Sequence, residues 1–379
     1  MTWLNNLATL QYHASLLGDR DRVDRFREAI HEVVRPGDVV VDLGTGTGLL
    51  AYFACQAGAA RVFAIEQGPI VNLARELSLL NRFADRIEFF EDLSYRVELP
   101  EPADVLITET LWNFGMGEGM VGFLVDARRR FLKPGARVIP AAIDLHVVPV
   151  QSDRLYALLH DRPPDRHGID LSPVRHYMVN NVHMPHLDAG GFLSQPARLL
   201  GSELDASATP DFDARVGVTA TATGIMHGVC GWFASRLSPS VVLTTEPPST
   251  DSSWAHAFFP LQNPVGVRPG DDIEIRIDTA DNGSRWRWRV EVRRAGRVVA
   301  GYDQSSASGF PGERYSATEA PAPSTSLDGE VVGWVLRAMD GTRSVAQLEA
   351  AALERFGARL HQADEVARLV RETVASYGR

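Results

Sequence analysis

The sequence lacks the features that define several protein classes. Its 379 residues include two cysteines, Cys55 and Cys230, which cannot form a disulfide framework and do not have metal-ligand spacing. No uncharged apolar run reaches the roughly 18 to 20 residues that a membrane span needs. The opening residues, MTWLNNLATLQYH, have no basic stretch followed by an apolar core, so no secretory signal is evident. These absences predict a soluble, cytoplasmic protein without a membrane partner.

Positive charge is also scarce. Aspartate and glutamate outnumber lysine and arginine by 48 to 38, which gives a net charge of −10. Because nucleic-acid binders depend on basic groups that meet phosphates, no nucleic-acid partner is expected. The acidic balance is compatible with a cationic substrate, although many proteins without one are equally acidic. With 45% hydrophobic residues, the chain is long enough for two or three globular domains.

The pattern of apolar segments changes along the chain. Over residues 1–145, strand-like runs such as VVVDL and RVFAIE alternate with helical segments, which is typical of βαβ units around a parallel sheet. Within this part, residues 12–34 are predicted to form one helix. Residues 146–310 contain strand-like segments separated by turn residues, which indicates an antiparallel β domain. Residues 311–326 have the composition of a linker, and three helical stretches follow over 327–379.

A glycine-rich segment, VVVDLGTGTG, joins the first strand to the next helix. Gly44, Gly46 and Gly48 would let the backbone approach a ligand closely, and the helix N-terminus would favour a carboxylate or phosphate. Asp42, just before the glycines, is unfavourable beside a pyrophosphate. It suits a ligand with an ammonium group, such as the methionine end of S-adenosylmethionine. A nicotinamide nucleotide is the alternative ligand, and Asp42 weighs against it.

Two more acidic residues close later strands. Glu66 ends the second strand, where a carboxylate can accept hydrogen bonds from both hydroxyls of a ribose. Asp92 closes the run RIEFFED, near the position expected for an adenine. The alternative is that the glycines form a simple turn and that Glu66 is solvated. Because the first acid, the glycines and the second acid are all in register, a nucleotide-type cofactor site is favoured.

The stretch TETLWNFGMGEGM contains two glutamates nine positions apart with no other charge between them. On a single helix, about 100° per residue would place Glu109 and Glu118 on opposite faces. They converge only if the chain reverses between Trp112 and Gly117, and Gly115 and Gly117 permit such a turn. Two converging carboxylates would bind a planar guanidinium in a fixed orientation. The alternative is a pair of solvated loop glutamates.

Together these motifs resemble the protein arginine methyltransferase family, almost collinearly from about residue 3 to 310. The likeness rests on VVVDLGTGTG, AIE, the two-glutamate loop, the helical segment HASLLGDRDRVDRFREAI and the segment HGIDLS. It implies an α/β Rossmann-like methyltransferase domain that binds S-adenosylmethionine, followed by a β-barrel substrate domain. Beyond the likeness, a small all-α domain is expected. The resemblance also implies that Arg22 holds the carboxylate of the cofactor, Glu66 its ribose, and Glu109 and Glu118 the substrate guanidinium.

The sequence departs from the family in the barrel. Where the family has a Thr-His-Trp motif, this chain has Ser252, Ser253 and Trp254. The tryptophan is kept and is expected at the substrate site. A serine replaces the histidine that would help to order the site, so a pairing of that histidine with Asp19 would be lost. His256 lies close in sequence and is expected at the surface.

Further differences concern the adenine site, the assembly and the C-terminus. The family's adenine-contacting glutamate is absent, and Tyr95 is expected in its place. Family members dimerise through a helical arm, for which residues 173–187 are the candidate, so a homodimer is compatible with the sequence. The C-terminal helices resemble small winged-helix-like domains of peptide chaperones and of methyltransferase regulatory domains. Because no strand precedes these helices, peptide binding by strand addition is not predicted.

The sequence thus predicts an S-adenosylmethionine-dependent N-methyltransferase that acts on arginine in a peptide or protein. Deprotonation of the guanidinium can follow transfer, so no strong base is required. The first alternative is a small-molecule or natural-product methyltransferase that keeps the scaffold but has a different acceptor, in which Glu118 would be expendable. A non-catalytic binding protein is disfavoured, because both the cofactor residues and the paired acids are present.

Overall fold

The chain divides into two compact units, Met1–Glu313 and Arg314–Arg379, each with its own apolar core. The computed structural model describes residues 2–117, 119–160, 165–166, 168–205, 207–248, 252–308, 325, 327–357 and 363–378. Apart from residue 325, the linker expected over 311–326 lies outside the described residues. The division between the units falls close to the boundary expected at residue 310.

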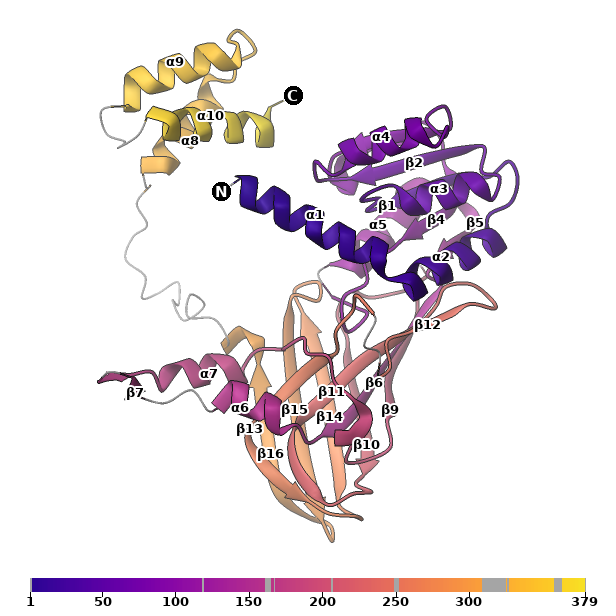
Figure 1. The fold of residues 1–379 in the computed structure, drawn as a ribbon, viewed down its shortest axis with the longest axis vertical. Coiled ribbons are helices and arrows are strands. Elements are labelled where there is room, and N and C mark those ends of the chain that lie inside the picture. Colours follow the sequence, from indigo (N-terminus) through magenta and orange to yellow (C-terminus); the bar gives the residue numbers. More distant parts are fainter. Residues whose placement is uncertain are drawn as a thin grey trace. The chain divides into compact units, whose positions relative to one another are not determined.

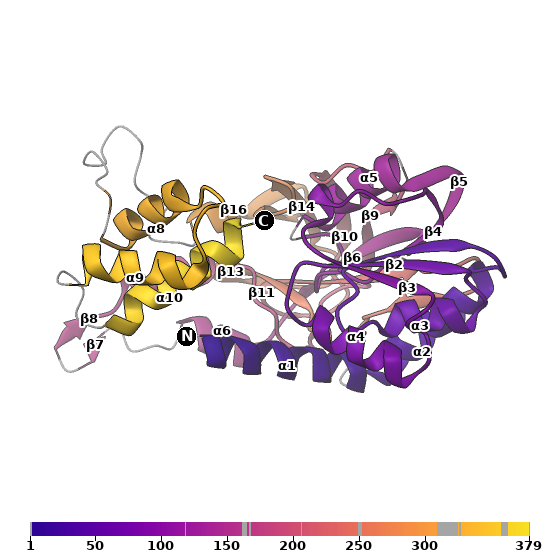
Figure 2. The same ribbon diagram turned by 90° about the horizontal axis from the view of Figure 1, so that it is seen from above.

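The first part of the larger unit is a parallel sheet with helices on both faces (Figure 1). The strands are β1 (Val39–Leu43), β2 (Arg61–Glu66), β3 (Ile87–Glu91), β4 (Ala103–Thr108) and β5 (Leu132–Ile139), in the order β3-β2-β1-β4-β5. The helices are α1 (Thr2–Gly18), α2 (Arg20–Val33), α3 (Leu49–Gln56), α4 (Val71–Leu80) and α5 (Met120–Phe131). Figure 2 shows α2, α3 and α4 on one face and α5 on the other. Because both faces are covered, every residue of β1 is buried.

The order of the strands decides where a ligand can bind. From β1 the chain adds β2 and β3 on one side, and it then returns to add β4 and β5 on the other side. The strands β1 and β4 are therefore parallel neighbours, although β2 and β3 lie between them in sequence. Open α/β sheets bind ligands outside the carboxyl ends of their strands at such a point. Here β1 leads into the glycine loop and β4 leads into Glu109. The topology therefore brings these two motifs together.

The helix predicted over residues 12–34 is in fact two helices. α1 ends at Gly18 and α2 begins at Arg20, because Asp19 has extended backbone angles (φ −76°, ψ 93°). The Asp19 carboxylate caps α2 by accepting a hydrogen bond from the backbone N–H of Arg22 at 3.1 Å. The prediction of one helix was wrong at this residue, which turns out to lie beside the candidate site.

Antiparallel strands form the barrel in the second part of the larger unit (Figure 1). They are β6 (Ala142–Val150), β9 (Ala197–Glu203), β10 (Asp213–Thr219), β11 (Gly224–Arg236), β12 (Val242–Thr244), β13 (Ala257–Val267), β14 (Asp272–Ala280), β15 (Arg285–Arg294) and β16 (Arg297–Ser305). One sheet has the order β12-β11-β6-β9, with β13 also on β11, and the other has the order β10-β14-β15-β16. Trp288 of β15 joins the two sheets, since its Nε1–H donates to the Pro260 carbonyl oxygen at 2.8 Å.

An arm leaves the barrel between β6 and β9 (Figure 1). It contains α6 (Asp153–His160), the short hairpin of β7 (Asp165–Arg166) and β8 (Ile169–Asp170), and α7 (Pro173–Val179). The arm was expected over residues 173–187, and the structure shows that it begins earlier, with α6. Gln304 of the barrel fixes it, because Nε2 donates to the Val179 carbonyl oxygen at 2.5 Å and Oε1 accepts from the Gln262 N–H at 2.9 Å.

The described residues of the smaller unit form three helices, α8 (Leu327–Ala338), α9 (Val345–Phe356) and α10 (Ala363–Tyr377). Ser344 caps α9, and Gln347 completes a capping box with it. Val331 and Val335 lie in the core of this unit, whereas Leu336 is exposed. Within the described part of the chain, no helix is both long and apolar enough to cross a membrane.

An aromatic cluster joins the loop after β4 to the barrel. Phe114 is fully buried, with ring centroids 5.5 Å from Phe259 and 5.8 Å from Trp286. Trp112 packs on the same Trp286 ring at 4.9 Å. All four residues belong to the core cluster of the larger unit or pack against it. The parallel-sheet part and the barrel therefore share a core at this loop.

Replacing Phe114 by alanine should lower the free energy of unfolding by about 3–5 kcal/mol, because the change removes aromatic contacts and leaves a cavity. Urea unfolding followed by circular dichroism measures the change. Leu79→Ala is the control, since Leu79 is 69% exposed and surface changes cost within about 0.5 kcal/mol. Equal stability of the two variants would contradict the shared core.

Candidate active site

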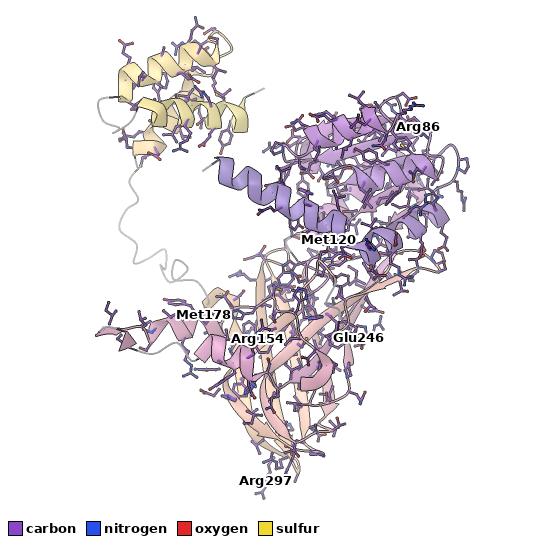
Figure 3. The ribbon with its side chains drawn as sticks, viewed as in Figure 1. Arg86, Met120, Arg154, Met178, Glu246 and Arg297 are labelled. Atoms are coloured by element: carbon purple, nitrogen blue, oxygen red, sulfur yellow. The ribbon has the colours of Figure 1, made fainter. Side chains whose placement is uncertain are left out.

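A cavity of about 620 Å³ lies at the carboxyl ends of β1, β2 and β4. Its walls come from the junction of α1 and α2, the glycine loop, the loop after β4, and Ser253 and Trp254 of the barrel. Met120, labelled in Figure 3, lines it where the parallel-sheet part meets the barrel. The volume falls within the range of small-molecule sites. The switch point of the sheet therefore carries a cavity large enough for a cofactor.

The glycine loop forms one wall of the cavity. Gly44 and Gly46 have φ of +76° and +54°, a region that glycine adopts far more readily than other residues. A Cβ atom on Gly44 would lie 2.9 Å from Thr110 Cγ2, and one on Gly46 would lie 3.0 Å from His13 Cε1. A side chain at either position would thus collide with the opposite walls. Gly48, predicted at the same site, begins α3 and does not line the cavity.

Asp42 lies beneath the glycine loop. Its side chain is fully buried, and it is not among the residues that line the cavity. Oδ2 accepts a hydrogen bond from Thr45 Oγ1 at 2.6 Å, and Oδ1 has no hydrogen-bond partner among the described residues. Burial raises the pKa of Asp42 to about 7, against the effect of the Thr45 hydroxyl. The structure therefore places Asp42 behind Thr45, which does line the cavity, and away from the direct ligand contact expected of it.

Glu66 faces the cavity from the end of β2. Its Oε2 accepts from the Gly46 N–H at 3.1 Å and its Oε1 from the Gly68 N–H at 2.8 Å, so two backbone donors orient the carboxylate. His13 of α1 also lines the cavity, and burial lowers its pKa, with Glu66 acting in the opposite direction. The sequence assigned no site role to His13, although it begins the segment HASLLGDRDRVDRFREAI that resembles the N-terminal helix of the family.

Asp92 lines the cavity at the end of β3, as its position in the sequence suggested. Its Oδ1 accepts from the Leu93 N–H at 2.7 Å. Tyr95, expected at the adenine position, is 47% exposed and does not line the cavity. It packs instead on Phe123, with ring centroids 5.2 Å apart. Phe123 lines the cavity, so it offers an aromatic side chain to a ligand where Tyr95 does not.

A buried ion pair joins α2 to the loop after β4. Arg22 Nη2 binds Glu109 Oε2, and the two side chains are only 10% and 7% exposed. Arg22 Nη1 also donates to the Leu16 carbonyl oxygen at 3.1 Å, while its Nε has no hydrogen-bond partner among the described residues. Burial raises the pKa of Glu109, and the charge of Arg22 opposes this rise. Glu109 is therefore a carboxylate that depends on a cation, and the cation that it binds is a guanidinium.

The loop after β4 reverses direction, as the spacing of the glutamates predicted. The Trp112 N–H donates to the Gly115 carbonyl oxygen at 3.1 Å, the Gly115 N–H donates back at 2.7 Å, and Gly115 has φ of +69°. Gly117 does not have a positive φ; a Cβ atom there would lie 2.9 Å from the Trp112 ring. Glu118 lies outside the described residues, so its convergence with Glu109 stays a prediction.

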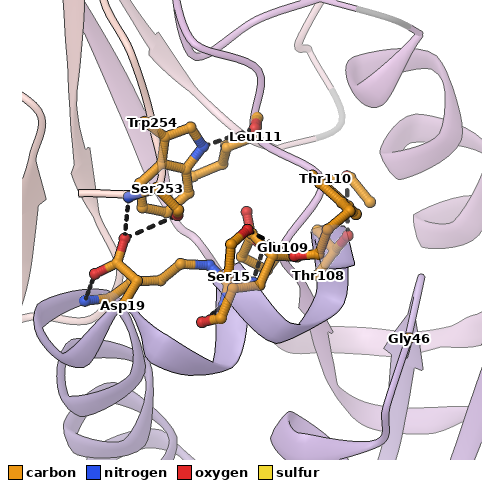
Figure 4. Close-up of polar contacts among 12 residues, drawn as sticks. Ser15, Asp19, Gly46, Thr108, Glu109, Thr110, Leu111, Ser253 and Trp254 are labelled. Carbon is orange, nitrogen blue, oxygen red and sulfur yellow. Dashed lines mark hydrogen bonds and ion pairs between the residues drawn. The ribbon is translucent and has the colours of Figure 1, made fainter. Parts of the chain in front are cut away.

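Ser253 and Trp254 connect the barrel to the other walls (Figure 4). Asp19 Oδ2 accepts hydrogen bonds from the Ser253 N–H at 2.6 Å and the Ser253 hydroxyl at 2.8 Å. Trp254 Nε1–H donates to the Leu111 carbonyl oxygen at 3.0 Å. A pairing of Asp19 with a histidine at this position was expected to be lost, and no histidine is present at residue 253. Ser253 nevertheless supplies Asp19 with two donors, which the sequence did not predict.

His256 is fully buried, although it was expected at the surface. Its Nδ1 accepts from the Leu187 N–H at 2.9 Å, and its backbone N–H donates to the Pro185 carbonyl oxygen at 2.9 Å. Burial lowers the pKa of the ring, which suits its role as a neutral acceptor. His256 thus fixes the segment that follows the arm and does not line the cavity.

The raised pKa of Asp42 predicts a pH dependence of stability. Its folded-state pKa of about 7 exceeds the ordinary 3.8, so the folded chain binds this proton more tightly than the unfolded chain. The contribution of Asp42 to stability is therefore lost as pH rises from about 4 to about 7. Asp42→Asn removes this titration and keeps an acceptor for Thr45. Its melting temperature, relative to that of the wild type, should increase by about 5 °C between pH 5 and pH 8.

Differential scanning calorimetry at the two pH values measures this change. Asp24→Asn, at an exposed position of α2, is the control and should differ from the wild type by a constant amount. A constant difference for Asp42→Asn as well would contradict the raised pKa.

Family models match both parts of the larger unit. The model described as the arginine methyltransferase oligomerization subdomain matches residues 141–292. The model described as ribosomal protein L11 methyltransferase (PrmA) matches residues 27–143. Neither match extends to the smaller unit.

Curated proteins include relatives over most of the chain. An arginine N(omega)-methyltransferase from Streptomyces achromogenes subsp. streptozoticus is 30% identical over 282 residues, which cover 72% of this chain and 76% of that protein. Protein arginine N-methyltransferase 6 from Danio rerio is 26% identical over 292 residues, which cover 73% of this chain and 83% of that protein.

Solved structures share the fold of the larger unit. The Trypanosoma brucei PRMT1 enzyme-prozyme heterotetrameric complex with AdoHcy has a TM-score of 0.71 and 24% identity, and the match covers 77% of this chain and 96% of that chain. Protein arginine methyltransferase 10 from Arabidopsis thaliana has a TM-score of 0.68 and 21% identity, with 78% and 99% covered. At these identities the likeness establishes the fold: a Rossmann-like domain followed by a β-barrel.

Proposed function

The chain belongs to the protein arginine methyltransferase family, and on that premise we propose that it transfers a methyl group from S-adenosylmethionine to a guanidino nitrogen of arginine. The observation that carries the proposal is Glu109, a buried carboxylate in the wall of the cavity that already binds the guanidinium of Arg22. A carboxylate that binds one guanidinium has the charge and shape to bind a second through its remaining lone pairs.

The residues of the cavity fit S-adenosylmethionine. The glycine loop offers backbone that a side chain would block, and Glu66 offers an oriented carboxylate to hydroxyl groups. The buried Nε of Arg22, without a partner among the described residues, suits a carboxylate of the ligand. When bound, the cofactor supplies an electrophilic methyl group on a sulfonium. We assign direct contact with it to Arg22, Gly44, Gly46, Glu66 and Asp92, and indirect support of the loop to Asp42 and Gly48.

Glu109 holds and orients the acceptor in this proposal. A guanidinium is planar, so a carboxylate on one edge fixes its plane and directs one terminal nitrogen towards the methyl group. The carboxylate also draws positive charge towards itself, which leaves more electron density on the attacking nitrogen. Arg22 offsets the effect of burial on the pKa of Glu109 and so favours the ionised form that binds a cation. Glu118 is proposed as the second carboxylate, and Trp254 as a wall of the acceptor site.

The acceptor is proposed to be arginine within a peptide or protein. The Danio rerio relative is named for protein arginine, and an Arabidopsis thaliana relative, 30% identical over 295 residues, is named for histone arginine. The Streptomyces relative is named for arginine alone, which supports a free guanidino compound as the second candidate. A cytoplasmic location and a homodimer formed through the arm are also part of the proposal. The match to an oligomerization subdomain supports the dimer.

Methyl-labelled S-adenosylmethionine distinguishes the acceptors. Incubation with arginine-containing peptides should place the label on guanidino nitrogens, as read by fragment mass spectrometry. Parallel reactions with free arginine and other small guanidino compounds test the second candidate. Label confined to these compounds would favour it, and calorimetry that detects no binding of the cofactor would favour a non-catalytic protein.

Glu109→Gln should lower kcat/KM for the acceptor by about 100-fold or more, because it removes the charge that fixes the guanidinium. Cofactor affinity, measured by calorimetry, should change much less. Glu203→Gln, at an exposed ion pair on the barrel, is the matched control and should keep wild-type activity. Full activity in Glu109→Gln would refute the mechanism, and full activity in Glu118→Gln would favour the small-molecule acceptor.

A further inference from the structure

Helix α2 is fixed to the barrel at both ends by contacts between serines and carboxylates. At its N-terminus, Asp19 Oδ2 accepts from the N–H and the hydroxyl of Ser253 at 2.6 and 2.8 Å. Near its C-terminus, Glu32 Oε2 accepts from the hydroxyls of Ser238 and Ser240 at 2.5 and 2.6 Å. The donors belong to two separate barrel segments, one between β11 and β12 and the other just before β13. The helix is therefore held at two points by the same chemistry.

The two ends differ in what they hold. At the N-terminus, the other oxygen of Asp19 accepts from the Arg22 N–H at 3.1 Å, so the carboxylate held by Ser253 also caps the turn that carries Arg22. The Arg22 side chain then binds Glu109 in the wall of the cavity. At the C-terminus, neither Glu32 nor its serine partners line the cavity. Of these two contacts, only the one at Asp19 is therefore connected, through Arg22, to a side chain that lines the cavity.

The contacts around Asp19 close into a ring (Figure 4). From Glu109 the chain runs two residues on to Leu111, whose carbonyl oxygen accepts from Trp254 Nε1–H at 3.0 Å. Trp254 follows Ser253 directly, and Ser253 returns to Asp19. The ring thus joins α2, the loop after β4 and the barrel. Because each member is held on two sides, displacing one shifts its neighbours.

We propose that Ser253 is a positioning residue for methyl transfer, acting through Asp19 on Arg22 and through Arg22 on the Glu109 carboxylate. The inference rests on the proposed function of Glu109. Asp19 is almost fully buried, so the loss of the Ser253 hydroxyl would leave its carboxylate short of a hydrogen bond. The carboxylate would turn to its remaining donors and loosen the cap, and Arg22 would move with the first turn of α2. The Glu109 carboxylate would then no longer be held in one orientation towards the acceptor.

Three variants test the inference. Ser253→Ala removes the hydroxyl and keeps the N–H donor, whereas Ser253→Thr keeps both. Ser238→Ala is the matched control, because it removes a hydroxyl–carboxylate contact from the other end of the same helix. Each is compared with the wild type in kcat and KM for the acceptor, in cofactor affinity by calorimetry, and in melting temperature.

We expect Ser253→Ala to lower kcat about tenfold, the effect of losing one hydrogen bond to a charged group. The kcat of Ser253→Thr and that of Ser238→Ala should both lie within about twofold of the wild-type kcat. Both alanine variants should lower the melting temperature, because each loses a hydrogen bond. If Ser253→Ala does not fold, Ser253→Cys, with a weaker donor of similar size, replaces it and should have a kcat below that of Ser253→Thr.

Wild-type kcat in Ser253→Ala, an equal loss in Ser238→Ala, or no rescue by Ser253→Thr would each overturn the inference. A wild-type protein that methylates no guanidino acceptor would refute the proposed function instead, and the inference with it. The wild-type reaction therefore separates the two failures before any variant is compared.

Discussion

The site depends above all on the buried ion pair between Arg22 and Glu109, which are 87 residues apart in sequence. A buried ion pair is stable only while both charged side chains stay in contact. The elements around the pair therefore have to keep Arg22 and Glu109 in position. The parallel sheet places Glu109 at the end of a central strand. The cap at Asp19 sets the first turn of the helix that carries Arg22. The barrel holds both sides through Ser253 and Trp254.

Much of the fold and part of the site could be predicted because their signals are local. The buried strand β1 is apolar apart from Asp42, whereas β15 alternates inward tryptophans with outward arginines. Likewise, Glu66 ends β2 and Glu109 directly follows β4 of the same parallel sheet, so their position at one edge of the sheet follows from topology. What lies beneath a loop leaves no such signal. From the sequence, the Asp42 carboxylate could face either a ligand or the protein interior. In the structure it lies in the interior, where it accepts a hydrogen bond from Thr45.

Contacts between segments that are distant in sequence also could not be predicted from local patterns. The sequence shows that a histidine pairing with Asp19 is lost at residue 253, but it does not show that the serine makes a contact of its own. The backbone N–H of residue 253 donates as well, and the short hydroxyl reaches the same oxygen. The position of the backbone, which no local pattern encodes, therefore preserved the link. His256 is a similar case, because its hydrogen-bond partners, Pro185 and Leu187, lie about seventy residues earlier in the sequence.

The described residues of the three C-terminal helices form a hydrophobic core of their own, which includes Val331, Val335 and Val370. A segment with a hydrophobic core of its own can be gained, lost or exchanged by gene fusion without removing residues from the core of the other unit. Selection can therefore act on α8 to α10 separately from the Rossmann-like domain and the barrel. The evolutionary history of α8 to α10 can therefore differ from that of the Rossmann-like domain and the barrel.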